Sequence, residues 1–226
     1  MISIHNLSKN FGNIQALENI NIQFDKGNVY GIVGENGAGK TTLFKCIAGL
    51  ENYDGQINSE FKPLKNYLGL LLTEPFFFSK ITGREYIQLL CNARKKEITK
   101  IDDKNIFDLP LNQYASTYST GMKKKLALLA ILLQKNQCFI LDEPFNGVDI
   151  HSNIIIVDLI HKLKALNKTV IISSHIFSTL SDTCDEIFLL KEGKIVKKVF
   201  RENFNALELE MREFTIGNKI EKLELK

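Results

Sequence analysis

The stretch Gly34-Glu35-Asn36-Gly37-Ala38-Gly39-Lys40-Thr41-Thr42 decides the fold, because it fits G-x-x-x-x-G-K-[ST], the pattern of a phosphate-binding loop. Its glycines tolerate backbone angles that other residues avoid, so backbone N–H groups can curl inward around an anion. Lys40 adds a positive charge for the β- and γ-phosphates of a nucleotide, and the Thr41 hydroxyl is placed to bind Mg²⁺. A helix that starts near Lys40 directs the positive end of its dipole at the same phosphates.

The residues on either side of this loop supply the context that the motif needs. Residues 29–33 form a short apolar run that predicts a strand, and residues 43–50 have the pattern of a helix. The alternative, a plain glycine-rich turn, does not require a strand before it and a helix after it. The strand and the helix therefore favour the phosphate loop.

The composition is that of one α/β domain with a smaller appended lobe. The chain has 226 residues and a formal net charge of +3, which gives no case for a nucleic-acid partner. No apolar run approaches the 18 residues or so of a membrane span, and the N-terminus has no signal-peptide pattern, so we expect a cytosolic chain. The four cysteines are scattered in apolar surroundings and are expected to be buried free thiols.

The apolar pattern predicts two kinds of sheet. Residues 2–6 and 14–24 alternate apolar with polar side chains over much of their length, as half-buried strands do. Residues 138–141 and 169–173 are continuously apolar, which is typical of parallel strands buried on both faces, and residues 187–199 read as a hairpin. The expected fold class is α/β, a phosphate-loop NTPase core with a mostly parallel sheet, an N-terminal antiparallel β subdomain and an inserted helical lobe.

The inserted lobe is predicted where strand patterns disappear. Helical patterns run from Thr82 to Arg94, over residues 102–107 and from Ser119 to about Gln134. The C-terminal residues alternate as a strand does but are rich in glutamate, so strand and helix both remain open for them. We divide the single domain into a core of residues 1–75 and 136–200, a helical lobe of residues 76–135, and a C-terminal extension of residues 201–226.

Acidic and imidazole side chains follow the two buried strands. Asp142 and Glu143 come at the end of the strand of residues 138–141, and His175 follows the strand of residues 169–173. In an open parallel sheet, ligands bind outside the carboxyl ends of the strands, which favours a shared site over a solvated acidic strand end or a structural histidine. Asp142 would hold Mg²⁺ through water, Glu143 would orient or deprotonate an attacking water, and His175 would donate a hydrogen bond to the transferring phosphoryl group.

With these motifs in order, the chain resembles the nucleotide-binding subunit of an ABC transporter over about residues 1–200. The matching segments follow the order of the family's motifs. They are Phe11 as the adenine-stacking aromatic, residues 34–42 as the Walker A loop, Tyr118-Ser119-Thr120-Gly121-Met122 as a variant signature motif, residues 139–143 as Walker B with its catalytic glutamate, Asn146-Gly147-Val148-Asp149 as the D-loop, and His175 as the switch histidine.

The resemblance implies an ATPase that uses ATP and Mg²⁺. Catalysis would rest on Lys40, Glu143 and His175, and the metal would be held by Thr41 and Asp142 with Thr73. The implied nucleotide-binding residues are Phe11, Asn36, Gly37, Ala38, Gly39, Lys40, Thr41 and Thr42, joined by Ser119 and Gly121 for the ATP on the partner subunit.

The implied partners are a second ATPase subunit, identical or related, and an integral-membrane permease. The chain would then be cytoplasmic and peripheral on the cytoplasmic face of the cell membrane.

Two alternative functions stay open. One is a soluble ABC-type ATPase of DNA repair or translation, and the other is a subunit that binds ATP without hydrolysing it. A GTPase is disfavoured because Asn167-Lys168-Thr169-Val170 has valine where the guanine-reading aspartate belongs.

The residues of the signature segment by themselves predict an anion-binding site. Ser119 offers a hydroxyl, and the N–H groups of Thr120 and Gly121 are expected at a helix N-terminus. The following run Lys123-Lys124-Lys125 opposes the helix dipole, which a facing phosphate would relieve, and each lysine by itself is interpreted as part of a solvated charge run.

Two further segments carry open interpretations. The glutamine of the family's Q-loop is absent, and Thr73, or less favourably Glu74, stands in its place. The apolar run Phe76-Phe77-Phe78 is interpreted either as a docking patch for the membrane partner or as lobe core.

Overall fold

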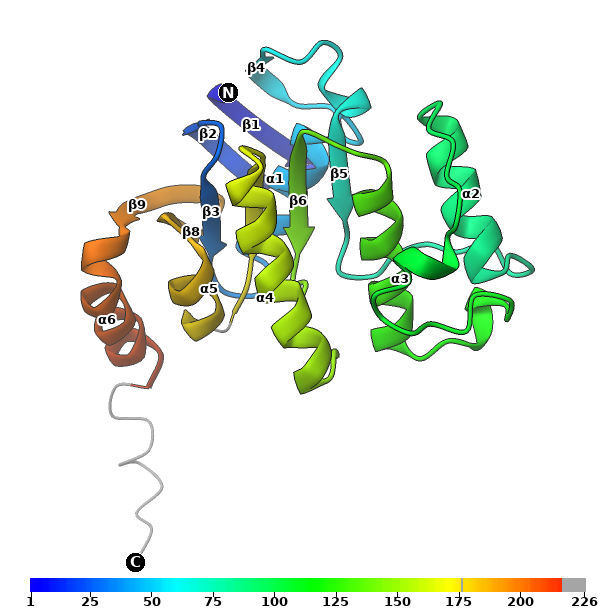
Figure 1. The fold of residues 1–226 in the computed structure, drawn as a ribbon. Coiled ribbons are helices and arrows are strands. Elements are labelled where there is room, and N and C mark those ends of the chain that lie inside the picture. The colour runs from blue at the N-terminus through cyan, green and yellow to red at the C-terminus, as the bar shows by residue number, and fades with distance from the viewer. Residues whose placement is uncertain (176, 217–226) are drawn as a thin grey trace, which may run out of the picture.

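Two sheets carry the fold of the computed structural model, which describes the backbone of residues 1–175 and 177–216 and side chains as far as residue 210 (Figure 1). The smaller sheet is antiparallel, with the strand order β2-β1-β4. Its strands are β1 (Ile2–Phe11), β2 (Ile14–Phe24) and β4 (Asp54–Ser59). This is the predicted antiparallel β part.

The larger sheet has six strands in the order β5-β6-β7-β3-β8-β9. Its strands are β3 (Val29–Val33), β5 (Leu68–Leu71), β6 (Cys138–Asp142), β7 (Thr169–Ser173), β8 (Glu186–Lys191) and β9 (Lys194–Phe200). All neighbours are parallel except β8 and β9, which form the expected hairpin. Every residue of β3, β6 and β7 is buried, as continuous apolar runs in a parallel sheet predict.

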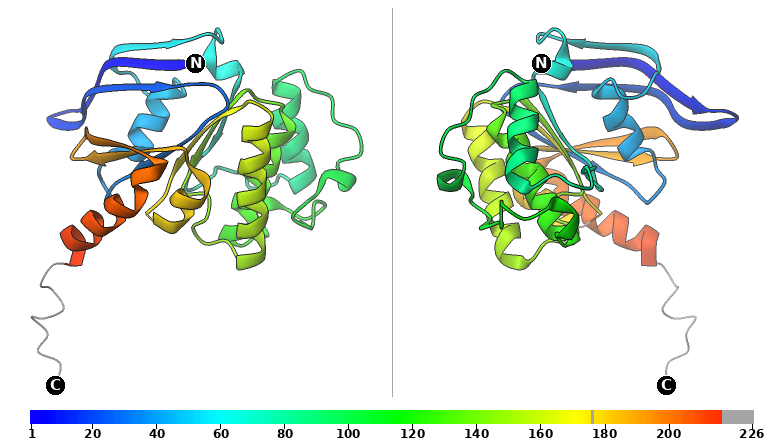
Figure 2. Two further views of the ribbon diagram at one scale, coloured as in Figure 1. Left: turned by 60° about the vertical axis from the view of Figure 1, so that its left-hand side comes forward. Right: turned by 90° about the vertical axis from the view of Figure 1, so that its right-hand side faces the viewer.

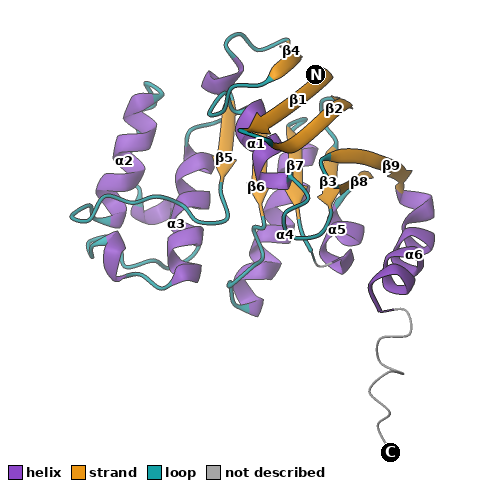
Figure 3. Cartoon of the chain, turned by 180° about the vertical axis from the view of Figure 1, so that it is seen from behind, coloured by secondary structure: helices purple, strands orange, loops and turns teal. Residues whose placement is uncertain are grey.

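Helices cover both faces of this sheet (Figures 2 and 3). Helix α1 (Lys40–Ile47) lies between the two sheets, where Leu43 and Phe44 share one apolar core with β1 and β2. The opposite face packs against α3 (Thr120–Leu133), α4 (Ile150–Ala165) and α5 (Phe177–Thr183) in a second core. The fold is therefore the predicted α/β class, with the phosphate loop held between β3 and α1.

The helical lobe is built from α2 (Gly83–Ala93) and the N-terminal part of α3, beside the edge strand β5 (Figure 1). Thr82 caps α2 in a reciprocal box with Glu85, which is the geometry typical of the pattern Thr82-Gly83-Arg84-Glu85. Short 3₁₀ turns lie at Leu64–Asn66, Asp102–Lys104 and Ala115–Thr117.

The expected helix over residues 102–107 is wrong, because only the 3₁₀ turn Asp102–Lys104 forms there. The side chain of Asn105 donates to the carbonyl oxygen of Leu109 at 2.9 Å and accepts from its N–H at 3.1 Å. Such side-chain bonds to the backbone compete with a helical ladder. The segment therefore forms a loop instead.

The C-terminal extension is helical, which settles the interpretation that the sequence leaves open. A turn at Arg201–Asn203 leads into α6 (Phe204–Ile216), which lies against β9 on the side of the sheet away from the lobe (Figure 1). Phe204 and Leu207 are buried whereas Leu209 is exposed, which is the spacing of one apolar helix face and not of a strand. Residues 217–226 lie outside the described part of the chain.

All four cysteines are buried free thiols, as expected. Burial raises the pKa of the Cys46, Cys91 and Cys138 thiols to about 11 and that of Cys184 to about 12. They act as small core residues. Among the described residues, no helix is long and apolar enough to cross a membrane.

Candidate nucleotide and magnesium site

The candidate site lies where four neighbouring strands, β5, β6, β7 and β3, end at one edge of the parallel sheet. The loops that leave these ends border a cavity of about 700 Å³. The lining residues are Ala16, Gly34, Glu35, Asn36, Gly37, Gly39, Lys40, Thr41, Thr42, Thr73, Asp142, Glu143, Asn146 and His175. Segments far apart in the sequence thus converge, as the position of ligands in open α/β sheets predicts.

The phosphate loop owes its shape to glycines at positions where a side chain would clash or strain the backbone. A Cβ on Gly34 would lie 2.2 Å from the carbonyl oxygen of Leu190. Gly37 and Gly39 have φ angles of +85° and +108°, which strain any residue with a side chain. Gly39 caps α1 without a side-chain hydrogen bond, so the first N–H groups of the helix are available to an anion.

Lys40 is buried at the inner side of this loop. Its ammonium group donates to the carbonyl oxygens of Gly34 at 2.7 Å and Glu35 at 3.1 Å. All the predicted residues of the loop line the cavity except Ala38, which is buried on the other side of the loop. The loop therefore brings a positive charge and a helix N-terminus to one place.

Asp142 is fully buried and accepts three hydroxyl hydrogen bonds. Thr41 donates to its Oδ2 at 2.6 Å, Thr73 donates to the same oxygen at 2.9 Å, and Ser173 donates to its Oδ1 at 2.6 Å. A carboxylate with neighbouring hydroxyl oxygens is a hard donor set that suits Mg²⁺, which also binds substrate phosphates and water. The residues predicted to hold the metal are thus together, and Thr73, not Glu74, faces Asp142.

Ser173 is a residue that the sequence reasoning missed. The register of β6 and β7 places it directly opposite Asp142, where it also accepts a hydrogen bond from the N–H of Glu143 at 3.0 Å. The sequence shows only that a serine ends a buried strand. Its hydrogen-bond partner depends on which strands pair, and the sequence alone does not give this pairing.

Glu143 and His175 form a hydrogen-bonded pair that lines the same cavity. Nδ1 of His175 lies 2.8 Å from Oε2 of Glu143, and because a carboxylate only accepts, Nδ1 carries the proton. Glu143 has a φ of +51°, a backbone conformation that costs about 1–2 kcal/mol for a residue with a side chain. Strained backbone conformations are found in turns and at functional sites.

The signature residues lie outside this cavity. Ser119 caps α3 by accepting from the N–H of Met122 at 3.2 Å, and the N-terminus of the helix is exposed there. The backbone of Gly121 passes so close to the D-loop that an added Cβ would lie 2.5 Å from the carbonyl oxygen of Gly147. Asp149 of the D-loop caps α4, and hydrogen bonds from Ser152 hold the pKa of Asp149 well below its usual range.

The interpretation of the lysine run as a solvated face is wrong for two of its three members. Lys124 is only 2% exposed and donates to backbone carbonyl oxygens of Glu143 and Asn146. Lys125 donates to Asp149 and Ser152, each at 3.1 Å. Carbonyl and carboxylate oxygens of the D-loop segment thus compensate these charges at an unfavourable helix end.

Phe11 is 46% exposed and is not a core aromatic. It ends β1 at the tip of the hairpin with β2, and Nζ of Lys9 lies 4.6 Å from the centre of its ring. Phe11 is not among the residues that line the cavity, although Ala16 of the same hairpin is. Its stacking on adenine stays a prediction.

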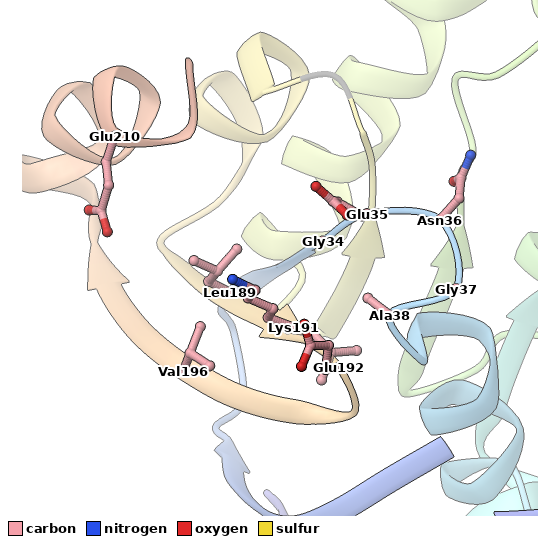
Figure 4. Close-up of a pocket in the computed structure, with 11 residues that line it drawn as sticks. Gly34, Glu35, Asn36, Gly37, Ala38, Leu189, Lys191, Glu192, Val196 and Glu210 are labelled. Atoms are coloured by element: carbon pink, nitrogen blue, oxygen red, sulfur yellow. The ribbon is translucent and has the colours of Figure 1, made fainter. Parts of the chain in front are cut away.

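A second cavity of about 540 Å³ borders the other side of the phosphate loop (Figure 4). Residues of the loop form one wall. The rest is formed by residues 189–192 and Val196 of the β8–β9 hairpin and by Glu210 of α6. The sequence could not indicate this cavity, because it depends on where α6 lies.

Comparisons with known proteins identify the family of the chain. The family model described as ABC transporter matches residues 17–146. The chain is 32% identical to the bacitracin transport ATP-binding protein BcrA of Enterococcus faecalis, over 95% of this chain and 73% of the relative. It is 30% identical to the lantibiotic transport ATP-binding protein SrtF of Streptococcus pyogenes, over 87% of this chain and 89% of the relative.

Solved structures show the same fold at lower identity. An ATP-binding subunit of an ABC transporter superposes with a TM-score of 0.80 at 23% identity, covering 94% of each chain. A dimeric ATP-binding cassette bound to ADP and phosphate superposes with a TM-score of 0.81 at 19% identity, covering 89% of this chain and 99% of the other. The chain belongs to the ABC transporter family and is an ATP-binding subunit of that family.

Proposed function

We propose that this chain hydrolyses ATP with Mg²⁺ and that the reaction powers transport of a substrate across a membrane through a separate permease. The observation that carries the proposal is the convergence of two pairs, Thr41 with Asp142 and Glu143 with His175, on the cavity of the phosphate loop. The first pair supplies metal ligands and the second supplies a base with its hydrogen-bonded imidazole, the parts that phosphoryl transfer to water requires.

In the proposed reaction, the oxygen of a water molecule attacks the γ-phosphorus while the bond to the β-phosphate oxygen breaks. Lys40 and the N–H groups at the start of α1 hold the phosphates. Thr41 and Asp142 would hold Mg²⁺, which would supply positive charge to neutralise them. Glu143 accepts a proton of the water, and His175 donates its Nδ1–H to the Glu143 carboxylate and thereby orients it. The predicted donation to the transferring group would use the same N–H and would replace this bond. The products are ADP and inorganic phosphate.

Two subunits are proposed to act together, as a homodimer or as a heterodimer with a related chain. Ser119 and Gly121 lie at the exposed N-terminus of α3 and outside the cavity of their own chain. A helix N-terminus with a serine cap is an anion site. We propose that it contacts the γ-phosphate held by the partner subunit, while Phe11 stacks on the adenine of its own ATP.

Two relatives that carry transport in their names support the transport role over a soluble ABC ATPase of DNA repair or translation. The proposed location is the cytoplasmic face of the cell membrane, where the chain is peripheral. The core, lobe and C-terminal extension as divided above remain our proposed organisation of this single domain.

The experiment that tests hydrolysis measures phosphate release from ATP by the purified chain, with Mg²⁺ and with excess EDTA. We expect release with the metal and its loss without it, because the buried Asp142 and its neighbouring hydroxyls are built for a hard cation. Nucleotide binding without any release in the metal-containing sample would instead support the subunit that binds ATP and does not hydrolyse it.

The three consecutive phenylalanines, residues 76–78, lie in two different environments. Phe77 is packed into the lobe core against Tyr86, with ring centres 4.5 Å apart. Phe76 and Phe78 are 74% and 56% exposed and contact each other edge to face. We propose that Phe76 and Phe78 dock on the membrane permease, because large exposed aromatics close together mark interaction surfaces.

Replacing both Phe76 and Phe78 by serine should release the chain from the membrane. In cells that express the permease, we expect the membrane-bound fraction to fall about tenfold or more, since two anchoring aromatics are lost. Fractionation followed by immunoblotting measures it. Leu50→Ser is the matched control, because Leu50 is also exposed but lies on the core beside α1. An unchanged membrane fraction in the double variant would contradict this docking site.

A further inference from the structure

The ammonium group of Lys124 occupies a position that neither the motifs nor the proposed reaction explains. Lys124 lies in the first turns of α3, three residues after Gly121 of the signature segment. It is almost fully buried, and Nζ donates at 2.8 Å to the carbonyl oxygen of Glu143 and at 2.8 Å to that of Asn146. A lysine is rarely buried unless it is paired, so these contacts define a specific structural role.

Both acceptors belong to one tight turn that begins with Glu143. The N–H of Asn146 donates to the carbonyl oxygen of Glu143 at 3.2 Å, which closes a four-residue turn with Pro144 at its second position. Lys124 bonds the first and last residues of this turn from the side. The ammonium group therefore holds the turn that carries the proposed base.

The backbone of Glu143, which has a positive φ, is held from several directions. Glu143 has a φ of +51°, its N–H donates to Ser173, its carbonyl oxygen accepts from Lys124, and its carboxylate accepts from His175. Each polar group of the residue is thereby fixed by a different partner. Strained conformations persist where surrounding contacts over-determine them, and Lys124 contributes to these contacts from outside the sheet.

Charged and polar groups surround the buried ammonium group of Lys124. Burial lowers the pKa of Lys124 below its usual value, and the neighbouring charges of Glu143 and Asp142 offset only part of this lowering. The carboxylates thus offset part of the cost of burying the ammonium group, which the two carbonyl oxygens offset further.

We infer that Lys124 is a positioning residue for Glu143: its two hydrogen bonds to the turn 143–146 set the direction of the carboxylate toward the attacking water. The inference rests on the proposed ATPase function. Since α3 also begins with the signature segment, the same side chain links the helix that is proposed to contact the partner's nucleotide with the base that acts on the chain's own nucleotide.

The test compares Lys124→Met with the parent chain. Methionine keeps a long unbranched apolar side chain and removes the ammonium group, so the turn loses two hydrogen bonds at little change in volume. We expect kcat for ATP hydrolysis to fall about 10- to 100-fold, because small displacements of a reacting group have effects of this size. The dissociation constant for a fluorescent non-hydrolysable ATP analogue should stay within about twofold, since Lys124 is not among the residues that line the cavity.

A double-mutant cycle separates positioning from general loss of structure. In a Glu143→Gln background, Lys124→Met should not lower single-turnover hydrolysis further, because the residue that it positions no longer acts as a base. Lys124→Gln, which keeps N–H donors without the charge, should recover part of kcat and carries the test if Lys124→Met does not fold. Lys162→Met makes the same change at an exposed lysine of α4 and should match the parent.

The outcomes distinguish this inference from the proposed function. An inactive parent chain would overturn the proposed function itself. With an active parent that depends on Glu143, three results would overturn only the role of Lys124: a parental kcat in Lys124→Met, a loss of nucleotide affinity as large as the loss of kcat, or full additivity with Glu143→Gln.

Discussion

Replacing Glu143 by Gln should lower kcat for ATP hydrolysis by about 10²- to 10⁴-fold, which is the range that a general base contributes. Glutamine has the same shape and can keep a hydrogen bond to His175, but its amide cannot accept the proton of the attacking water. The phosphate loop and Asp142 are untouched, so ATP should still bind. Phosphate release and nucleotide affinity, measured on the same preparation, check both halves of this expectation.

We propose further that the dimer opens only after hydrolysis, so the same variant should accumulate in an ATP-bound dimer. Light scattering in the presence of ATP and Mg²⁺ measures the mass of the complex. Glu202→Gln is the matched control, since Glu202 is exposed in the turn Arg201–Asn203 and should leave both rate and mass unchanged. Hydrolysis at the parental rate after Glu143→Gln would remove Glu143 from the role of base.

Replacing Asp142 by Asn should reduce kcat/KM for Mg²⁺-ATP by about 100-fold or more, because the metal contributes several kcal/mol of charge stabilisation. Asparagine preserves the volume and offers one oxygen to the hydroxyls of Thr41, Thr73 and Ser173. It removes the charge that a divalent cation needs.

A binding measurement makes this second prediction independent of turnover. Titration calorimetry should show that the parent chain binds a non-hydrolysable ATP analogue more tightly with Mg²⁺ than without it. In Asp142→Asn the affinity should be the same with and without the metal. Metal-free binding should remain, because Lys40 and the start of α1 hold the phosphates. Asp103→Asn, at an exposed position of the helical lobe, should behave as the parent does. A parental response to the metal in Asp142→Asn would place the magnesium ligand elsewhere.

Several parts of the site could be predicted from the sequence because their geometry is local. The phosphate loop is set by glycines and a lysine within nine residues, and the caps of α2, α3 and α4 are set by Thr82, Ser119 and Asp149. Continuous apolar runs indicate buried parallel strands, and the carboxyl ends of such strands share one edge of the sheet. This reasoning is sufficient to bring Asp142, Glu143 and His175 toward the loop.

Other parts of the site could not be predicted because they depend on contacts across the fold. The partner of Ser173 follows from the register of β6 and β7, and the choice of Thr73 over Glu74 follows from the direction of the chain after β5. The lysine run illustrates the limit best. By pattern it is a solvated face, yet α3 packs on the D-loop and buries Lys124 against two carbonyl oxygens.

The sequence by itself determined the class of the protein and the chemistry of its nucleotide loop, because backbone freedom at glycine and the charge of a lysine act within a few residues. Only the tertiary structure decided which hydroxyls reach Asp142, which phenylalanines stay exposed and which lysine supports Glu143. The physical reason is that hydrogen bonding and burial of a side chain depend on neighbours that are distant in the chain, and only the packed fold specifies these neighbours.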